Sequence, residues 1–366
     1  MKKYYALLLD VCNWTLESSE DLRNHILSKL LTVSNIEIVG TDKFIVYEEL
    51  DYERFINFLK KTFKEPIAIN NEKFYISFRI GIAEYLPYTS KSLIVQNCFL
   101  ALKRIKNAPP WSYEIYSETL QEQYKIARML QYAIENNLVA IKYQPYYDIH
   151  TGKICGAEAL ARIKIEGQEI SPGKFIPVAE EFGYMPQLEV LILKKIWEET
   201  KNLNPMKVSI NISSYPYDGK QFEELCYYLE QIACIHDVVL EITEESKFFD
   251  KVNNLCSTIT KEFFLALDDV GKGYNGINRF IHGIDIVKLD MSYISQIHNP
   301  QIELIVKTLI DLSHKLNLYV IAEGVETEEQ LEKLADLHCD CIQGYLISKP
   351  IDILELRDWL TKEQAS

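Results

Sequence analysis

From residue 140 to its last residues, the chain alternates short apolar runs with longer stretches of helical periodicity. The apolar, β-rich runs lie at residues 140–143, 154–160, 207–212, 238–242, 263–267, 284–289, 318–322 and 341–345. Helical stretches separate most of them, for example residues 187–200, 222–234 and 302–316. Repeated strand–helix units form a parallel sheet, because parallel neighbours need a crossover connection. About eight such units in roughly 230 residues predict an α/β fold with a closed (β/α)8 barrel of the TIM type.

Acidic or amide side chains stand at the carboxyl end of nearly every predicted strand. They are Glu158, Asn211, Glu241, Glu244, Asp268, Asp269, Asp290 and Glu323, and they are accompanied by Lys288. One such residue alone is more often a helix cap or part of a surface ion pair. In a barrel, however, these ends converge on one mouth, where several carboxylates repel one another unless cations compensate them. Oxygen ligands of this kind suit Mg²⁺ or Mn²⁺, and a pair of such ions suits phosphodiester hydrolysis.

Length and composition limit the other classes of protein. The chain has 366 residues and a formal net charge of −14, which suits two domains and argues against DNA binding, because DNA-binding proteins usually carry a basic face. No stretch approaches the ~20 apolar residues that cross a bilayer, so we expect a cytoplasmic protein without membrane contact. The eight cysteines are scattered and form no CxxC pair, which predicts reduced thiols.

The first part of the chain predicts a smaller α+β domain at residues 1–116. Its expected strands are residues 5–10 and 73–83, with a hairpin formed by 37–39 and 44–47, and its expected helices are 21–31, 52–63 and 92–106. A helix at residues 117–138 is expected to connect this domain to the barrel.

The motifs of the barrel region resemble the EAL domain family of cyclic di-GMP phosphodiesterases. The matching stretches are Tyr143-Gln144-Pro145, Glu158-Ala159-Leu160 with Arg162, residues 175–180, Asn211-Ile212-Ser213, Glu241-Ile242-Thr243-Glu244, Asp268-Asp269, Lys288-Leu289-Asp290, residues 322–327, and Gln343-Gly344-Tyr345 with Lys349-Pro350. They follow the family's order and cover residues 124–366. A single Glu-Ala-Leu match could arise by chance, but this ordered set of motifs could not.

The resemblance implies a role for each matching residue. Glu158, Asn211, Glu241 and Asp268 correspond to ligands of one metal ion, and Asp268, Asp269 and Glu323 to those of a second. Lys288 corresponds to the lysine that orients the attacking water, and Glu323 is also a candidate for proton transfer. Gln144, Arg162 and Gln343 correspond to substrate-binding positions, and Glu244 and Asp290 to supports of the loop after Asp269. The implied activity is hydrolysis of cyclic di-GMP to linear pGpG by a homodimer with Mg²⁺ or Mn²⁺.

Two departures from the family's pattern leave alternatives open. The loop after the aspartate pair is Val270-Gly271-Lys272-Gly273-Tyr274-Asn275-Gly276, where the family usually has Phe-Gly-Thr-Gly-Tyr-Ser-Ser. A lysine near the expected cations could weaken their binding, and residues 163–166 also differ from the usual sequence. The alternative function is a catalytically weak or inactive receptor for cyclic di-GMP that signals through a protein partner. A purely structural protein predicts substituted metal ligands, which the sequence does not have.

The order of elements in residues 1–116 resembles a GGDEF domain, the diguanylate cyclase fold. Asp10 and Cys12 stand where that family has two metal-binding aspartates, and the signature turn becomes Gly40-Thr41-Asp42-Lys43. Cyclisation of GTP needs both acidic ligands and a turn that phosphates can approach. We therefore expect a degenerate domain without cyclase activity, which either binds a ligand such as GTP or serves as a scaffold, with Lys43 exposed on the turn.

Overall fold

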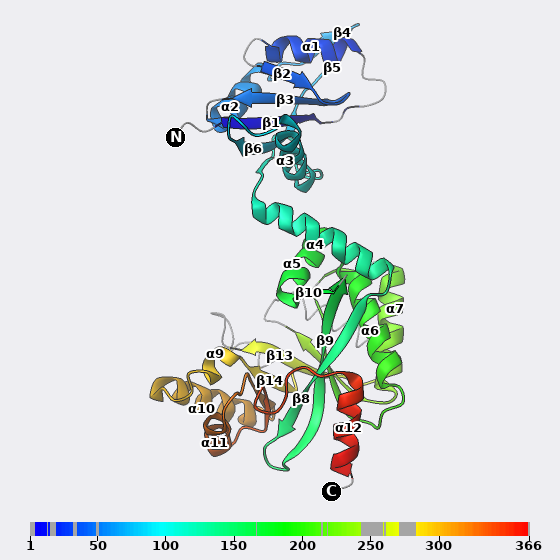
Figure 1. Ribbon diagram of the computed structural model, residues 1–366, viewed down its shortest axis with the longest axis vertical. Helices are drawn as coiled ribbons and strands as arrows, with labels where there is room; N and C mark the ends of the chain where they lie inside the picture. The colour runs from blue at the N-terminus through cyan, green and yellow to red at the C-terminus, as the bar shows by residue number, and fades with distance from the viewer. Residues whose placement is uncertain are drawn as a thin grey trace. The chain divides into compact units, whose positions relative to one another are not determined.

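The chain divides into two units, Met1–Ile126 and Ala127–Ser366 (Figure 1). The computed structural model describes residues 4–12, 14, 20–31, 35–48, 51–165, 167–213, 215–217, 219–242, 259, 261–270 and 283–364.

The N-terminal unit is built on a sheet with the strand order β2-β3-β1-β6-β7. Its strands are β1 (Tyr4–Val11), β2 (Asn35–Ile38), β3 (Lys43–Glu48), β6 (Phe78–Tyr85) and β7 (Tyr113–Ile115), and its helices are α1 (Glu20–Leu31), α2 (Tyr52–Thr62) and α3 (Lys91–Arg104). Because side chains alternate along a strand, Leu7 and Leu9 of β1 pack with α1 and α2, while Ala6 and Leu8 pack with α3 on the opposite face. The unit is therefore a sheet with helices on both faces.

The predicted elements of this unit are confirmed with one correction. β2 and β3 pair antiparallel, as the hairpin prediction required. The single strand predicted at residues 73–83 is wrong, because that stretch is divided between two sheets. β5 (Glu72–Phe74) pairs with β4 (Ile67–Ile69) in a separate hairpin, whereas β6 pairs with β1 in the main sheet. Periodicity alone could not show that these apolar residues serve different sheets.

The C-terminal unit contains the predicted closed barrel. Its strands are β8 (Val139–Asp148), β9 (Lys153–Ile165), β11 (Lys207–Asn211), β12 (Asp237–Ile242), β13 (Phe264–Val270), β14 (Ile286–Leu289), β15 (Tyr319–Glu323) and β16 (Cys341–Gln343). β8 pairs with both β9 and β16, which closes the ring. Its helices are the end of α4 (Glu118–Glu135), α5 (Pro172–Phe182), α6 (Met185–Thr200), α7 (Gly219–Ala233), α9 (Met291–Ile294), α10 (Pro300–Lys315), α11 (Glu328–Asp336) and α12 (Ile353–Gln364), and β10 (Gln168–Ile170) extends β9.

The first barrel strand departs from the all-parallel arrangement that the strand–helix alternation predicts. β8 runs antiparallel to both of its neighbours, whereas consecutive strands from β9 and β11 to β16 are parallel. Residues 149–152 are too few for a crossover, so β8 and β9 can only form a hairpin. Asp148 holds the turn, since its Oδ1 accepts hydrogen bonds from the backbone N–H groups of His150 and Thr151.

The interior of the barrel is filled by side chains rather than open. A buried cluster of Tyr146, Val239, Ala266, Ile286, Ile321 and Cys341 occupies it below the strand ends that carry the acidic residues. Between the barrel and its outer helices, a second apolar cluster packs β13–β16 against α10 and α11. The two layers together fix the strands whose carboxyl ends form the candidate site.

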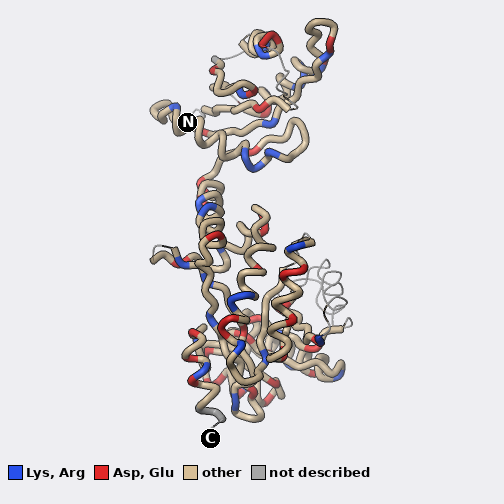
Figure 2. Tube along the Cα trace, turned by 90° about the vertical axis from the view of Figure 1, so that its right-hand side faces the viewer, with Lys and Arg blue, Asp and Glu red and all other residues tan. Residues whose placement is uncertain are grey.

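Acidic and basic residues are interspersed along the chain in both units (Figure 2). Among the described helices, none is long and apolar enough to cross a membrane.

Gly344 lies directly after β16, where the rim of the barrel leaves no space for a side chain. A Cβ atom there would lie 2.1 Å from the backbone oxygen and 2.3 Å from the backbone nitrogen of Val325. We therefore expect Gly344→Ala to lower the free energy of unfolding by more than about 2 kcal/mol, because backbone must move. Urea denaturation of the full chain, followed by circular dichroism, measures this change.

Gly173 provides the matched control. It lies in the first turn of α5, and a Cβ atom there meets nothing within 4 Å. Gly173→Ala should leave stability unchanged or raise it by about 0.5–1 kcal/mol. Equal losses in both variants would contradict the packing argument.

Candidate active site at the barrel mouth

The centre of the site is the buried ammonium of Lys288, on β14. Its side chain is 1% exposed, and its Nζ lies 2.7 Å from Glu323 Oε1, 2.9 Å from Glu241 Oε2, 3.3 Å from Asp268 Oδ1 and 3.5 Å from Glu158 Oε2. Burial alone would lower the pKa of Lys288, but the four carboxylates outweigh it and hold that pKa well above its usual range. Lys288 is therefore the positive centre about which the acidic strand ends assemble.

Glu158, on β9, is held by donors from two other strands. Asn211 Nδ2 on β11 donates to its Oε1 at 2.7 Å, and Gln343 Nε2 on β16 donates to its Oε2 at 2.9 Å. Burial favours the neutral acid, but the Lys288 ammonium and these hydrogen bonds lower the pKa of Glu158 below its usual value. Glu158 is therefore ionised and fixed in orientation.

The remaining carboxyl groups are more easily protonated than usual. Burial and the neighbouring Glu158 raise the pKa of Glu241 well above its ordinary range, despite Lys288. Burial also raises the pKa of Asp268, and it raises that of Glu323 to about 7 with the help of Asp268 and Glu158. One ammonium cannot neutralise four carboxylates, so the cluster retains protons near neutral pH.

A bulge in β13 brings Asp268 and Asp269 to the site together. Leu267 pairs with Val287 and Val270 with Leu289, so both aspartates stand opposite Lys288 alone. Asp269 adopts a φ of 56°, in the left-handed region that aspartate tolerates better than most residues. Bulges re-aim side chains beside active sites. Here the bulge brings carboxylate oxygens of Asp268, Asp269 and Glu323 within 4.8 Å of one another.

The donor set fits a hard divalent cation. The atoms at the mouth are carboxylate and amide oxygens, which Mg²⁺ and Mn²⁺ prefer. No donor among the described residues reaches the buried Oε1 atoms of Glu241 and Gln343. Buried acceptors are normally satisfied, and the excess of carboxylates over ammonium calls for added positive charge. The cluster of Asp268, Asp269 and Glu323 is the place among the described residues where three acidic ligands converge.

Three other predicted site residues have hydrogen-bond or ion-pair partners outside the Lys288 cluster, and one predicted site residue lies outside the described part. Gln144 on β8 donates to the backbone oxygen of Ser348 at 3.3 Å, and Arg162 lies 3.8 Å from Glu169. Asp290 caps α9 by accepting a hydrogen bond from the N–H of Ser292 at 3.0 Å. Glu244 lies outside the described residues, as does the loop of residues 271–276.

Glu189 is a site-supporting residue that the sequence argument missed. It lies on α6, is 3% exposed, and accepts a hydrogen bond at 2.6 Å from the N–H of Ser213. Ser213 follows Asn211 by two residues, so Glu189 fixes the chain where β11 ends. The available signal was a glutamate within the apolar run of α6, because such a residue is rarely buried without a specific partner.

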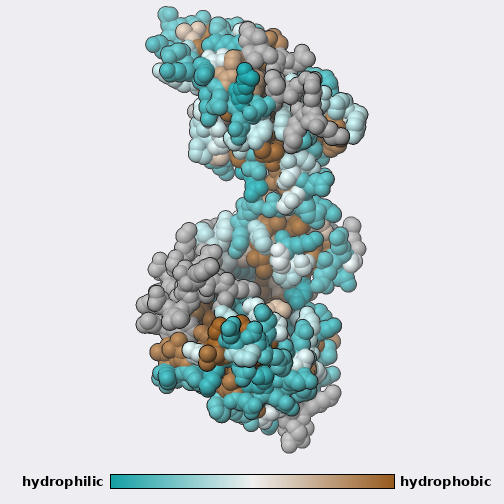
Figure 3. All heavy atoms as spheres, turned by 90° about the vertical axis from the view of Figure 1, so that its left-hand side faces the viewer, coloured by the Kyte–Doolittle hydropathy of each residue, from teal (hydrophilic) through white to brown (hydrophobic). Residues whose placement is uncertain are grey.

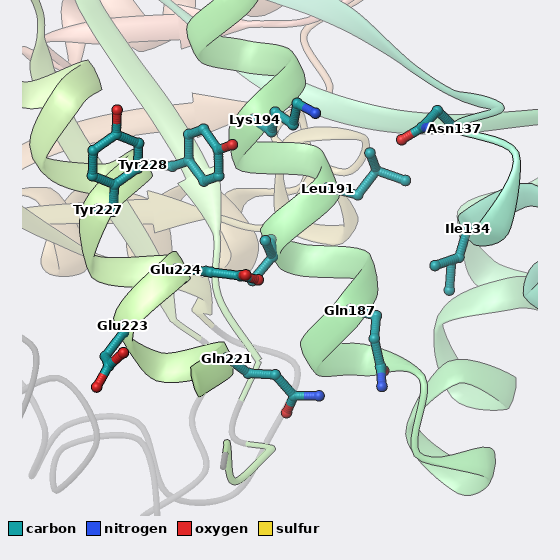
Figure 4. A pocket seen from close by; sticks show the side chains of 11 residues that line it. Ile134, Asn137, Gln187, Leu191, Lys194, Gln221, Glu223, Glu224, Tyr227 and Tyr228 are labelled. Atoms are coloured by element: carbon teal, nitrogen blue, oxygen red, sulfur yellow. The ribbon is translucent and has the colours of Figure 1, made fainter. Parts of the chain in front are cut away.

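A separate groove of about 490 Å³ lies among the end of α4, α6 and α7 (Figure 4). Leu191, Tyr227 and Tyr228 contribute to its wall, with Gln187, Lys194 and Glu224 at its polar positions. None of the predicted site residues lines it, so it is not the place where the acidic strand ends could act on a substrate.

The comparison with known families agrees with the barrel fold of the C-terminal unit. A family model described as "EAL domain" matches residues 127–350, and the chain belongs to this family. Among curated proteins, it is 32% identical over 242 residues to the probable cyclic di-GMP phosphodiesterase PdeG of Escherichia coli (strain K12), covering 62% of this chain and 48% of that protein. It is 29% identical over 345 residues to the cyclic di-GMP phosphodiesterase NbdA of Pseudomonas aeruginosa, covering 87% and 44%. The chain thus spans less than half the length of either relative.

A solved structure shows the same barrel. The C-terminal part of the chain is similar to the PaMucR phosphodiesterase in complex with c-di-GMP, with a TM-score of 0.55 and 25% identity. The match covers 63% of this chain and 99% of that one.

The raised pKa of Glu323 predicts how stability varies with pH in the metal-free protein. The folded chain keeps a proton on Glu323 up to about pH 7, whereas the unfolded chain loses it near 4.5, so stability falls as pH rises through this window. Glu323→Gln removes this titration. Between the two pH values, the free energy of unfolding of the variant should therefore fall by up to about 3 kcal/mol less than that of the wild type. Urea denaturation in EDTA at pH 5 and pH 8 measures the difference.

The control is Glu332→Gln, at an exposed position on α11. It should keep the pH dependence of the wild type. A Glu323→Gln protein with the same pH dependence as both would show that this carboxyl does not hold the proton.

Proposed function

We propose that the C-terminal unit hydrolyses cyclic di-GMP to linear pGpG with the help of two divalent cations, Mg²⁺ or Mn²⁺. The observation that carries this proposal is the buried Lys288 ammonium with four carboxylates around it at the mouth of a barrel. Membership of the EAL domain family and two relatives named as cyclic di-GMP phosphodiesterases support the choice of substrate. We assign residues 124–366 to this domain and residues 117–138 to the connecting helix.

The two proposed cation sites share Asp268. Glu158, Asn211, Glu241 and Asp268 would hold one cation, and Asp268, Asp269 and Glu323 the other. When bound, the cations would supply the Lewis acidity that lowers the pKa of water and neutralises charge on the scissile phosphate. The oxygen donors of the chain would thus hold cations that attract a phosphodiester, in a protein whose own net charge is −14.

Lys288 and Glu323 carry the proposed proton chemistry. Lys288 donates hydrogen bonds from a fixed, buried position, so it can orient the attacking water toward the phosphorus atom. Glu323 lies 2.7 Å from Lys288 Nζ, so its carboxylate is placed to accept a proton from the water that Lys288 orients and to return it.

We propose that Gln144, Arg162 and Gln343 bind the guanine and phosphate groups of the substrate. Gln343 is 3% exposed and its Oε1 lacks a donor among the described residues, so it has one acceptor to offer. Asp290 would support the loop after Asp269 through its cap on α9, and Glu244 would brace the same loop.

Glu158→Ala should abolish turnover, because it removes an ionised ligand and leaves its partners Asn211 and Gln343 without an acceptor. The measurement is chromatography of pGpG formed from cyclic di-GMP with Mg²⁺ or Mn²⁺, for the wild type and the variant. The Glu332→Gln protein is the matched control and should keep the wild-type rate. A Glu158→Ala protein with near-normal turnover would exclude the proposed site.

The same experiment tests the alternative function. Lys272 in the altered loop favours a receptor that binds cyclic di-GMP without turnover and signals through a protein partner. If no pGpG forms with the wild type but cyclic di-GMP binds, measured by isothermal titration calorimetry, the receptor function replaces the enzyme.

We propose that residues 1–116 are a degenerate GGDEF-like domain without cyclase activity. Lys43 is not an exposed turn residue, as its sequence position suggested, but is partly buried with Nζ 2.8 Å from both Asp10 and Asp42. The ammonium neutralises Asp10, which is the remaining candidate metal ligand. The Lys43 ammonium thus takes the position of the metal ion that Asp10 would bind. A ligand such as GTP would have to bind without that metal ion.

A homodimer is the proposed assembly. Hydrophobic side chains reach the surface of the C-terminal unit (Figure 3), and Met291, Leu304 and Ile305 of α9 and α10 are 54%, 65% and 40% exposed. Symmetric pairs commonly cover such faces.

Incubation of the full chain with GTP and Mg²⁺ should yield neither cyclic di-GMP nor its hydrolysis product pGpG, because both acidic ligands of a cyclase are needed. Lys43→Ala should remain inactive, since Cys12 still replaces the second ligand. Formation of cyclic di-GMP or pGpG from GTP by the wild type, detected by mass spectrometry, would contradict the assignment.

A further inference from the structure

Two thiols meet inside the barrel, nearer the amino ends of their strands than the carboxylate cluster. Cys155 on β9 and Cys341 on β16 have their Sγ atoms 2.9 Å apart. Cys341 belongs to the buried interior cluster, and Cys155 packs against that cluster while keeping partial exposure to solvent. The proposed phosphodiester chemistry uses neither thiol.

A bulge in β9 creates this contact. Ile154 pairs with Tyr147 and Gly156 with Tyr146, so Cys155 is the extra residue that β8 leaves unpaired. β8 separates β9 from β16, and regular strands on either side of it would hold their side chains apart. Because a bulge bends its strand and re-aims a side chain, Cys155 reaches across β8 to Cys341. Its Sγ also lies 3.6 Å from the backbone oxygen of Tyr146.

The surroundings favour the thiolate form at Cys155 and the protonated thiol at Cys341. The hydrogen bond with Cys341 and the Lys207 ammonium lower the pKa of the Cys155 thiol, although burial opposes them. The pKa of Cys341 is raised by the interaction of this thiol with Cys155 and by burial, so Cys341 stays protonated. Tyr319 holds Cys341 in place, since its hydroxyl lies 3.3 Å from that Sγ. A partly exposed thiol near a cation is the type that reacts with oxidants.

We propose that Cys155 and Cys341 are a redox modification site at which a hydroperoxide forms an intramolecular disulfide. The Cys155 thiolate attacks one peroxide oxygen, the O–O bond breaks, and the other oxygen leaves as water after taking a proton. The resulting sulfenic acid is attacked by the sulfur of Cys341, which forms the S–S bond and releases a second water. Two thiols thereby lose two electrons and two protons, and one hydrogen peroxide becomes two waters.

The other described thiols lack this combination. Cys98 and Cys339 are fully buried, and burial raises the pKa of each to about 12. Cys234 is exposed at the surface after α7, and no second thiol is hydrogen-bonded to it in the described structure. Cys234 can be oxidised, but among the described thiols only the pair in the barrel has a resolving thiol at contact distance.

Oxidation at this position would act on strands that carry site residues. Cys155 precedes Glu158 by three residues on β9, and Cys341 precedes Gln343 by two on β16. Gln343 and Glu158 are already joined by a hydrogen bond of 2.9 Å. An S–S bond is about 2.05 Å long, so the disulfide draws β9 and β16 together beneath that contact. The modification itself does not depend on the proposed phosphodiesterase activity.

Treatment of the full chain with a small excess of hydrogen peroxide, followed by alkylation and non-reducing peptide mass spectrometry, tests the proposal. We expect a cross-linked pair of peptides that carry Cys155 and Cys341 within one chain, and we expect dithiothreitol to remove it. Cys155→Ser and Cys341→Ala should lose the cross-link completely. In Cys341→Ala, a sulfenic acid on Cys155 should react with dimedone, because the resolving thiol is absent.

Cys234→Ser is the matched control and should retain the cross-link. Wild-type protein in which Cys155 is oxidised to a sulfenic or sulfinic acid without a cross-link would overturn the proposal. So would cross-links that join two chains only, seen on non-reducing gels. The wild-type measurement needs no substitution, so a variant that fails to fold does not prevent a decision.

Discussion

The arrangement of the barrel mouth depends on one buried ammonium. Lys288 is 1% exposed and contacts carboxylates from β9, β12, β13 and β15, so a single side chain joins four strands that are dispersed along the sequence. A buried charge is tolerated only when partners compensate it. Lys288 therefore requires the acids, and the acids require Lys288 and, in our proposal, two cations. In the same proposal, the interaction that fixes the strand ends also prepares them for an anionic substrate.

Two bulges adapt an otherwise regular barrel to chemistry. In β13 the bulge presents Asp268 and Asp269 together opposite Lys288, and in β9 it turns Cys155 toward Cys341. Regular alternation would send adjacent residues to opposite faces of the sheet. Each bulge interrupts this alternation at one place, and in each case the residues that it re-orients are acidic or carry a thiol. Irregular pairing thus marks the two parts of the barrel at which we propose chemistry.

The sequence predicted the strands and the convergence of their ends, because apolar periodicity and the position of acidic residues are local features. It could not predict the direction of β8, which follows from the short turn after Asp148, nor the split between β5 and β6. The contact of Cys155 with Cys341 and the support of Ser213 by Glu189 join residues far apart in sequence, and no local pattern encodes them. Lys43 belongs to the same group, since its pairing with Asp10 requires the β1–β3 register.

The position of β8 between β9 and β16 has a consequence for how the protein is made. β8 and β9 are neighbours in the chain and can form their hairpin as soon as both have left the ribosome, but the other edge of β8 meets β16 only when residue 341 has been synthesised. Until then the growing sheet keeps two open edges, which are prone to pairing with other chains. Closure of the ring therefore waits for β16, because only a chain synthesised past residue 343 has all the strands of the barrel.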